Sequence, residues 1–330
     1  MASAAPRIVV TGAAGSVGCE VVRALVARGE RPCAVDLSAR DVAALHGREV
    51  ESAGLDYRDH RSFRGVLRGC STLFLVRPPT IADMETTLLP LIDAAVAHEV
   101  GHVVFLSVVG ADTNALVPHH AVEKHLVKSG LSHTLLRPGF FAQNLGASYR
   151  SDIADDDRLY LPAGRGRVAF VDIRDVAEAA AAIILDPGAH RGAAYTCTGP
   201  EALSFEEAAR LITDVIGRPI RYESASIAGY VRHLHHRGLP LDQIAVQTIL
   251  HVGVRFGQGE RIDPTLEMLL GRRPRTLAAY VRDSADLFAS SRALSPTRPN
   301  AREKRRVDRS RPLSSRDESG YDLPVDVPHK

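Results

Sequence analysis

The chain has 330 residues, a formal net charge of +2 and 45% hydrophobic residues, enough to bury a sizeable core. No run approaches the roughly 18 apolar residues of a membrane span, and the stretch MASAAPRIVV lacks the charged and then apolar order of a signal peptide. Four scattered cysteines without a C-x-x-C pair argue against a disulfide framework or a zinc site. We expect a cytoplasmic protein, and the excess of Arg over Lys suggests a GC-rich bacterial genome.

Short apolar runs alternate with amphipathic stretches through the first half of the chain. Strands are predicted at 7–11, 31–36, 71–76, 102–107 and 133–138. Helices are predicted at 16–28, 39–46, 60–68, 84–99 and 119–129. Strands separated by helices of this length form right-handed βαβ units. The predicted fold class is α/β, a doubly wound Rossmann-type parallel sheet with ligands at the carboxyl ends of its strands.

The pattern loosens after residue 139. An extended segment precedes a helix that we expect to start near Asp175, and AAYTCTG and RYESAS read as further strands. Ser204 and Glu207 form a capping box for a helix that ends at Gly217, and residues 226–288 look mostly helical. We expect a core over about 7–200 and a small, mostly helical lobe over about 201–288, together making one domain of residues 1–291.

The last stretch, residues 292–330, is rich in Pro, Ser and Arg and has almost no apolar pattern. Such a segment buries too little surface to offset its ordering entropy, so we predict a disordered basic tail. Its cluster REKRR could bind nucleic acid, but a solvated tail is the favoured interpretation. The low aromatic content and the absence of Trp provide no stacking platform for bases.

The most informative motif is IVVTGAAGSVGCEVVRALVARG, in which Gly12-x-x-Gly15-x-x-Gly18 follows a strand and opens a helix. Glycine permits a tight turn and lets the backbone approach a pyrophosphate, and the helix N-terminus presents free N–H groups to it. Ser16 and Val17 belong to the same turn. We interpret the motif as a dinucleotide site; a purely structural turn is the alternative.

Asp36 ends the second predicted strand, close to the ~20-residue spacing at which an acid binds the ribose 2′-hydroxyl. A carboxylate there would repel a 2′-phosphate, which favours NAD over NADP. Arg40 in the following turn could reach the phosphate and partly reverse this. A helix N-cap is the alternative role for Asp36.

VTGAAGSVG, LFLVRPP, VVFLSVVGAD, HHAVEKHLVKSGLSHTLLRPGFFAQN and FVDIRDVAEAAA together resemble the NmrA-like group of atypical short-chain dehydrogenases. This group includes quinone and azo-dye reductase-like proteins, nucleotide-sensing regulators and relatives of agroclavine dehydrogenase. The resemblance covers residues 7–288. It implies that Gly12, Gly15 and Gly18 bind pyrophosphate, and that Asp36 replaces an Arg that many relatives carry.

The resemblance also implies roles in the loops that follow the strands. Asp56 would flank the adenine, although a turn residue is an equal interpretation. Arg77 and Pro78 would lie beneath the nicotinamide ribose. Three residues would pack against the nicotinamide in a motif that Asn144 closes: Pro138, Gly139 and Phe140.

The stretch VPHHAVEKHLVKSG stands where a reductase of this kind would often carry Tyr-x-x-x-Lys. His120 precedes Lys124 by one helical turn, and an imidazole donates a proton readily near neutral pH. The His-x-x-x-Glu-Lys register of the resembling group selects His119 and Glu123 instead. Both histidines cannot face one cleft, and solvated residues at a helix start remain an alternative.

Lys124 is one of only four lysines in the chain. It would bind the nicotinamide ribose or stabilise developing negative charge, unless it is simply an exposed helix residue. Ser107, at the end of the fifth predicted strand, occupies the position of the usual short-chain dehydrogenase serine. We count Lys124, His119, His120 and Ser107 as the candidate catalytic residues.

These motifs predict an NAD(P)-dependent oxidoreductase that reduces a small organic acceptor. Without a Tyr acid, a quinone, an enone or an iminium fits better than an alcohol substrate. The alternative is a non-catalytic, nucleotide-sensing regulator that binds a partner protein. We expect a small-molecule substrate, leave a homodimer open, and expect no metal because RHLHHRG lacks nearby Cys or carboxylate ligands.

Overall fold

Seven strands form one parallel sheet in the computed structural model, which describes residues 7–289. The predicted tail therefore lies outside the described residues. The strand order is β3-β2-β1-β4-β5-β6-β9, so the direction of winding reverses between β1 and β4. Ligands of such sheets bind at that reversal, beyond the carboxyl ends of the strands. The strands are β1 (Arg7–Thr11), β2 (Cys33–Asp36), β3 (Glu51–Gly54), β4 (Cys70–Val76), β5 (His102–Leu106), β6 (His133–Pro138) and β9 (Ala194–Cys197).

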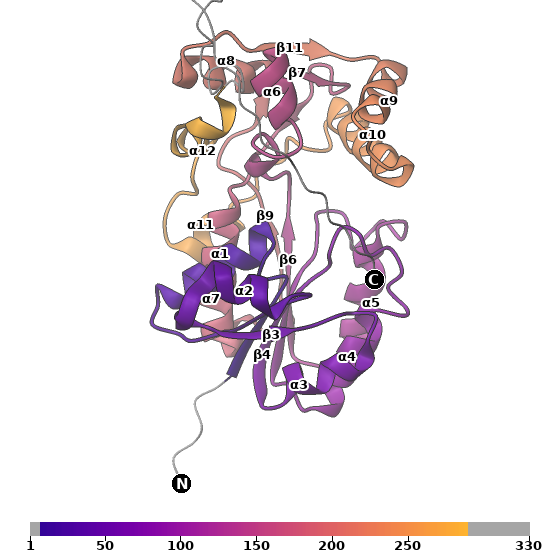
Figure 1. The fold of residues 1–330 in the computed structure, drawn as a ribbon, viewed down its shortest axis with the longest axis vertical. Coiled ribbons are helices and arrows are strands. Elements are labelled where there is room, and N and C mark those ends of the chain that lie inside the picture. The colour runs from indigo at the N-terminus through magenta and orange to yellow at the C-terminus, as the bar shows by residue number, and fades with distance from the viewer. Residues whose placement is uncertain (1–6, 290–330) are drawn as a thin grey trace, which may run out of the picture. The chain divides into compact units, whose positions relative to one another are not determined.

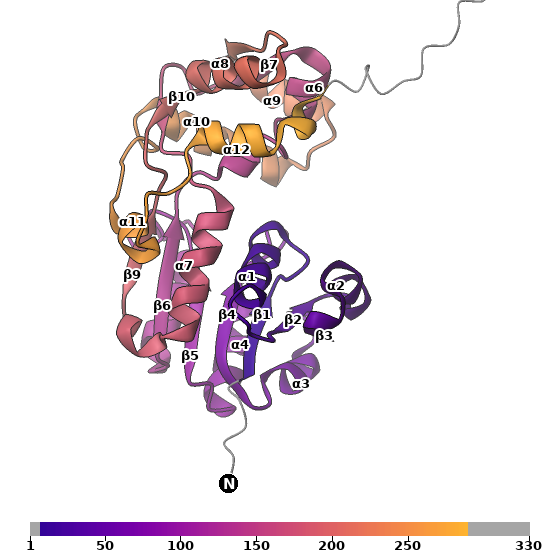
Figure 2. The ribbon, with the colours of Figure 1, turned by 90° about the vertical axis from the view of Figure 1, so that its left-hand side faces the viewer.

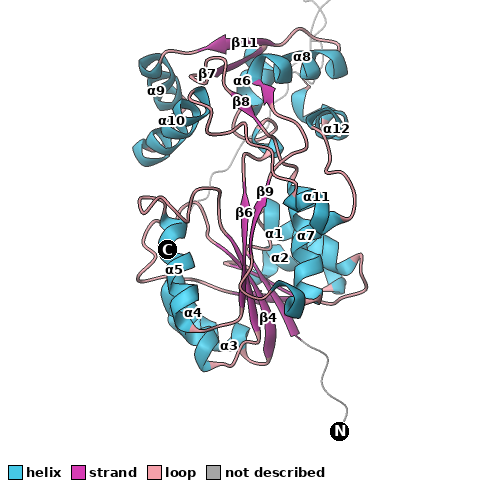
Figure 3. Ribbon diagram, turned by 180° about the vertical axis from the view of Figure 1, so that it is seen from behind, coloured by secondary structure: helices cyan, strands magenta, loops and turns pink. Residues whose placement is uncertain are grey.

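Helices cover both faces of the sheet, which confirms the predicted α/β fold class (Figure 3). One face carries α1 (Ser16–Val26), α2 (Ala39–His46), α7 (Ile173–Leu185) and α11 (Thr265–Leu270). The other face carries α3 (Phe63–Leu67), α4 (Leu88–Ala97) and α5 (Pro118–Ser129). Burial from both sides explains why β5 is apolar at nearly every position.

A second hydrophobic core lies beyond the carboxyl ends of the strands and forms the smaller lobe (Figure 1). Phe140, Phe170 and Phe205 meet edge to face there at centroid distances from 5.6 to 6.0 Å. The lobe contains α6 (Arg150–Asp156), β7 (Arg158–Leu161), β8 (Arg167–Val168), β10 (Leu203–Ser204), α8 (Phe205–Ile216), β11 (Arg221–Ser224), α9 (Ile227–His236), α10 (Leu241–Arg255) and α12 (Leu277–Asp283). It thus includes residues 140–170, a segment that the sequence pattern had suggested for the larger core.

The chain passes repeatedly between the two cores. After β6 it enters the smaller lobe, returns with α7 and β9, leaves again with α8, returns with α11, and ends in α12. Figure 2 shows α11 beside α7 and β9, below α12. The connections lie at residues 139, 171–172, 198–202, 256–264 and 271–276.

The capping box of α8 is present, with Ser204 and Glu207 bonded reciprocally and Gly217 in the left-handed conformation after the helix. Helix α7 starts earlier than expected: Asp172 is its N-cap, and Asp175 is fully buried. The Asp175 carboxylate instead accepts hydrogen bonds from Arg272 at 2.8 Å and from the Arg275 backbone N–H at 2.6 Å. A contact across about a hundred residues gives no local sequence signal.

Candidate functional site

The glycine turn after β1 has the geometry that a close-packed strand-turn-helix unit requires. Gly12 adopts a φ of +64°, which favours glycine. A Cβ on Gly18 would lie 2.1 Å from the Gly12 carbonyl oxygen, so only glycine allows α1 to approach the turn this closely. A Cβ on Gly15 would meet the same backbone oxygen at 3.2 Å, a tight contact but a much less severe one than at Gly18.

The N-terminus of α1 carries no side-chain cap, because Gly15 is its N-cap. Its first N–H groups and the helix dipole are therefore available to an anion. A pocket of about 470 Å³ opens beside Gly15 and Ser16 and reaches the smaller lobe at Gln143 and Tyr280. This arrangement could receive a phosphate group. The neighbouring Val17 packs against the larger core.

Asp36 lies at the end of β2, and its carboxylate turns toward the glycine loop. It accepts hydrogen bonds from the Ala14 N–H at 3.0 Å and the Leu37 N–H at 2.8 Å. The N-cap of α2 is Ser38, whose hydroxyl accepts from the Asp41 N–H, so the N-cap interpretation of Asp36 is wrong. Arg40 is exposed in the first turn of α2.

Asp56 makes a local turn after β3. Its carboxylate accepts from the Arg58 N–H at 2.9 Å, and its carbonyl accepts from the Ser62 hydroxyl at 3.1 Å. These bonds account for an Asp at this position through turn geometry alone. A contact with adenine stays a prediction.

Arg77 and His119 meet at the carboxyl end of β4. The Arg77 Nε donates to His119 Nε2 at 3.4 Å, and Arg77 Nη1 donates to the carbonyls of Ile81, Pro78 and Pro79 at 2.5, 3.2 and 3.5 Å. Burial lowers the pKa of Arg77. His119 is 9% exposed, and burial, then the charge of Arg77, lower its pKa to about 3.

Ser107 belongs to a buried polar chain that joins β5, α5 and β6. Its hydroxyl donates to Glu123 Oε1 at 2.5 Å, and Arg137 donates to both carboxylate oxygens of Glu123, at 2.9 and 2.6 Å. Arg137 also reaches Asp112 at 3.1 Å. The sequence analysis did not select Arg137, because an Arg in an apolar strand segment shows no partner in sequence.

His120 and Lys124 lie away from the buried face of α5. His120 is half-buried, and its Nδ1 lies 2.7 Å from the Ala111 carbonyl oxygen, to which it donates. Lys124 is exposed and has no carboxylate within 4 Å among residues 7–289. The buried residues of α5 include His119 and Glu123, whereas His120 and Lys124 are more exposed. The sequence did not decide between these two pairs, and the structure places them on different sides of the helix.

The loop after β6 connects the two cores. The Gly139 N–H donates to the Cys197 carbonyl at 2.9 Å, which fixes the backbone where Pro138 ends the strand. The Phe140 ring is buried in the smaller lobe's core, so the backbone rather than the ring borders the sheet edge. Asn144 closes a short 3₁₀ turn, and Pro78 accepts the Arg77 hydrogen bond described above.

A buried Tyr149–His251 pair in the smaller lobe also escaped the sequence analysis. The two atoms Tyr149 Oη and His251 Nε2 are 2.5 Å apart, and His251 Nδ1 lies 2.6 Å from the Gln247 carbonyl. Burial lowers the pKa of His251 to about 4. The partners are a hundred residues apart, and neither lies in a recognisable motif.

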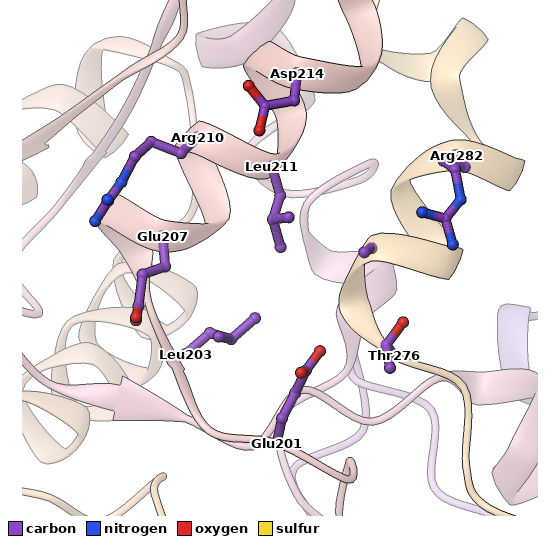
Figure 4. A pocket seen from close by; sticks show the side chains of 9 residues that line it. Glu201, Leu203, Glu207, Arg210, Leu211, Asp214, Thr276 and Arg282 are labelled. Carbon is purple, nitrogen blue, oxygen red and sulfur yellow. The ribbon is translucent and has the colours of Figure 1, made fainter.

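A second pocket of about 600 Å³ lies between α8 and α12 (Figure 4). It presents the side chains of Glu201, Glu207, Arg210 and Arg282 around Leu203 and Leu211. None of the sequence-predicted site residues lines it. Within the described residues, no helix is long and apolar enough to cross a bilayer, and no group of three or more His, Cys, Asp or Glu could hold a metal ion.

Sequence comparison places these features in a family. The model of the NmrA-like family matches residues 5–281. The chain belongs to the NmrA-like family. It is 30% identical over 289 residues to the NAD(P)H azoreductase of Xenophilus azovorans, covering 86% of this chain and 100% of that protein.

Two further comparisons cover most of the chain. The agroclavine dehydrogenase of Claviceps fusiformis is 29% identical over 245 residues, 71% of this chain and 83% of that protein. The crystal structure of the NADPH-dependent quinone oxidoreductase from Escherichia coli complexed with NADPH has a TM-score of 0.76 and 27% identity. It covers 84% of this chain and 99% of that chain.

Proposed function

We propose that this NmrA-like protein is an NAD(P)-dependent oxidoreductase that reduces a small organic acceptor with hydride from NAD(P)H. The observation that carries the proposal is the glycine turn with the uncapped N-terminus of α1, located where the sheet reverses its winding. The names of its relatives support the same activity: an NAD(P)H azoreductase and an NADPH-dependent quinone oxidoreductase. Gly12, Gly15, Ser16, Val17 and Gly18 would hold the pyrophosphate.

The acceptor is a quinone, an enone or an iminium. The cofactor supplies hydride when bound, and the protein positions the acceptor and stabilises the charge that develops. The segment that would carry a tyrosine acid supplies His119 and His120 instead, and reduction of these acceptors needs no strong acid. The polar chain of Ser107, Glu123 and Arg137 would hold α5 against the sheet edge.

The test is to titrate the protein with NADH and NADPH by fluorescence and then to measure cofactor oxidation with quinones, enones and imines. The proposal expects binding and turnover with at least one acceptor class. Binding without turnover on any acceptor would favour the alternative, a nucleotide-sensing regulator. Absence of binding would overturn both functions.

Cofactor preference depends on Asp36 in this proposal. A relative solved with NADPH favours the phosphorylated cofactor, whereas a carboxylate at the end of β2 favours NADH because it repels a 2′-phosphate. We retain NADH as the proposed preference. Exposed Arg40 is the cation that would reach a 2′-phosphate.

Asp36→Asn should lower the Kd of NADPH relative to that of NADH by about tenfold or more, because one repulsive charge is removed near the phosphate. Asparagine keeps one acceptor oxygen for the Ala14 N–H and loses the bond from the Leu37 N–H. Fluorescence titration of both cofactors measures the ratio. Asp41→Asn, which removes an exposed charge from the first turn of α2, is the matched control. An equal change in the ratio of the two Kd values in both variants would contradict a specific role for Asp36.

Lys124→Met should weaken cofactor binding about tenfold and reduce turnover, because Lys124 would bind the nicotinamide ribose. Lys128→Met is the matched control, since Lys128 is an exposed lysine one turn further along α5. Titration and steady-state rates measure both effects. Identical behaviour of the two variants would assign Lys124 to the solvated face of the helix.

A further inference from the structure

Arg77 is a half-buried cation that has no carboxylate partner among the described residues. Within residues 7–289 no Asp or Glu oxygen lies within 4 Å of the Arg77 guanidinium. Arg137, which also contacts α5, pairs with Glu123 and Asp112. Backbone carbonyls at 2.5 and 3.2 Å hold Nη1 of Arg77. They leave Nε directed at α5, where it meets His119 at 3.4 Å.

This contact decides which nitrogen of His119 carries the proton. A guanidinium only donates hydrogen bonds, so His119 Nε2 accepts and must be unprotonated. The proton of the neutral ring then resides on Nδ1. Nδ1 is buried and has no hydrogen-bond partner among the described residues, on a side chain that is 9% exposed.

A buried N–H without a partner destabilises the folded protein, and this cost is removed when an acceptor atom reaches it. Protein atoms cover Nδ1, so an acceptor reaches it only after neighbouring side chains shift. The Phe105 ring lies 6.0 Å away, between centroids, and offers no acceptor oxygen. Among the described residues nothing supplies this acceptor, and an oxygen atom of a bound molecule would supply it after such a shift.

Arg137 and the carboxylates beside α5 are already paired, while Lys124 and Lys128 are exposed. From α4, Asp93 contacts His125 at 2.6 Å, and from β6, Arg137 pairs with Glu123. His120 donates to the Ala111 carbonyl. Arg77 is the group left to act on His119, and its charge joins burial in keeping the ring neutral.

We propose that Arg77 is a positioning residue that fixes His119 as the neutral Nδ1–H tautomer, and that this N–H donates to the carbonyl oxygen of the hydride acceptor. The inference rests on the proposed reductase function and narrows its substrate class to quinones and enones. An iminium is excluded because its positive charge would lie near the unpaired charge of Arg77, and because it offers no oxygen to the N–H.

The reaction then balances without protonation of His119. Hydride leaves the dihydronicotinamide with two electrons and adds to the acceptor, the cofactor becomes NAD(P)⁺, and an oxyanion forms on the acceptor. The Nδ1–H stabilises this oxyanion by a hydrogen bond, as neutral imidazoles can. A proton from solvent, which half-buried His120 could relay, completes the reduced product.

Nitrogen NMR of the imidazole tests the tautomer without any substrate. Wild-type His119 should show the Nδ1–H form and no titration between pH 5 and 8. In Arg77→Met the ring should lose its preference for the Nδ1–H form and populate the Nε2–H form, while burial, the larger cause of its low pKa, still keeps it neutral. Arg77→Lys, which keeps a donor and the charge, should retain the Nδ1–H form and serves if the Met variant does not fold. A wild-type His119 that titrates, or that carries its proton on Nε2, would overturn the proposal.

Turnover tests the donor role separately. Arg77→Met and His119→Ala should each lower kcat for a quinone roughly 10²-fold, and His119→Ala should leave the Kd of the cofactor nearly unchanged. The control is His125→Gln, because His125 lies on the same helix as His119 and pairs with Asp93 of α4. A faster rate with imines than with quinones would refute the substrate class. Lack of any wild-type turnover would defeat the reductase function, while the NMR result would stand on its own.

Discussion

Gly15→Asp should abolish measurable binding of NADH and NADPH while leaving the melting temperature unchanged or higher. A carboxylate about 5 Å from a pyrophosphate costs roughly 3 kcal/mol per unit charge at an effective dielectric constant of about 20, or more than a hundredfold in Kd. Gly15 is the N-cap of α1 in an extended conformation with φ of −83°, which Asp adopts readily and which Asp caps well. Binding and stability should therefore change in opposite senses.

Gly15→Asn isolates the charge in this experiment, because Asn has the same shape and also caps helices. It should retain much more cofactor affinity than the Asp variant. Isothermal titration and thermal unfolding measure the two properties on the same samples. If the Asp variant bound either cofactor as tightly as wild type, the glycine turn would not be the pyrophosphate site.

The protein should become less stable as the pH falls from 6.5 to 5. Burial is the first cause that lowers the pKa of His102 and His251 to about 4 and that of His119 to about 3. In the unfolded chain these rings bind protons below pH 6.5, but the folded protein keeps them neutral. Stability is therefore complete above about pH 6.5 and falls with pH toward the folded pKa.

Each of the three rings should contribute a loss on the order of 1–2 kcal/mol at pH 5. Denaturant unfolding at pH 7, 6 and 5 measures the loss. Carboxylates with lowered pKa, such as Asp172, contribute only at lower pH, so this window isolates the histidines.

His102→Gln should reduce the loss by about 2 kcal/mol, because Gln cannot titrate. The side chain lies between the hydroxyls of Ser132 and Thr134, at 2.8 and 2.9 Å, which Gln can also bond. His236→Gln, an exposed histidine, should leave the pH dependence unchanged. A free energy of unfolding that stays constant from pH 7 to 5 would contradict buried neutral rings.

Periodicity predicted the larger core well, because each central strand is a short, largely apolar run followed by a helix. Strand β3 was missed because ESAG, at the sheet edge, has intermediate or exposed side chains and no apolar pattern. Residues 140–170 were assigned to the larger core by their position in the chain. Their apolar side chains, including Phe140 and Phe170, pack with α8 instead, a choice that only the tertiary structure reveals.

The candidate site was predictable where one local motif carries the chemistry. The glycine turn needs only its own backbone, so its spacing sufficed. The contact of Arg77 with His119 joins a strand end to a helix start 42 residues later, and neither residue type signals it. The sequence could name both histidines but not their protonation, since this depends on burial and on which cation lies opposite.

The repeated passage of the chain between the two cores has a consequence for how the protein forms on the ribosome. The last buried side chains of the smaller lobe along the chain belong to α12 and Phe288. The last buried side chain of the larger core is Leu266 of α11, which also lies near the end of the described residues. Neither half of the nascent chain can close its core until nearly all of the described residues have been synthesised. Splitting the gene at residue 200 should therefore yield two fragments that expose apolar surface and depend on chaperones.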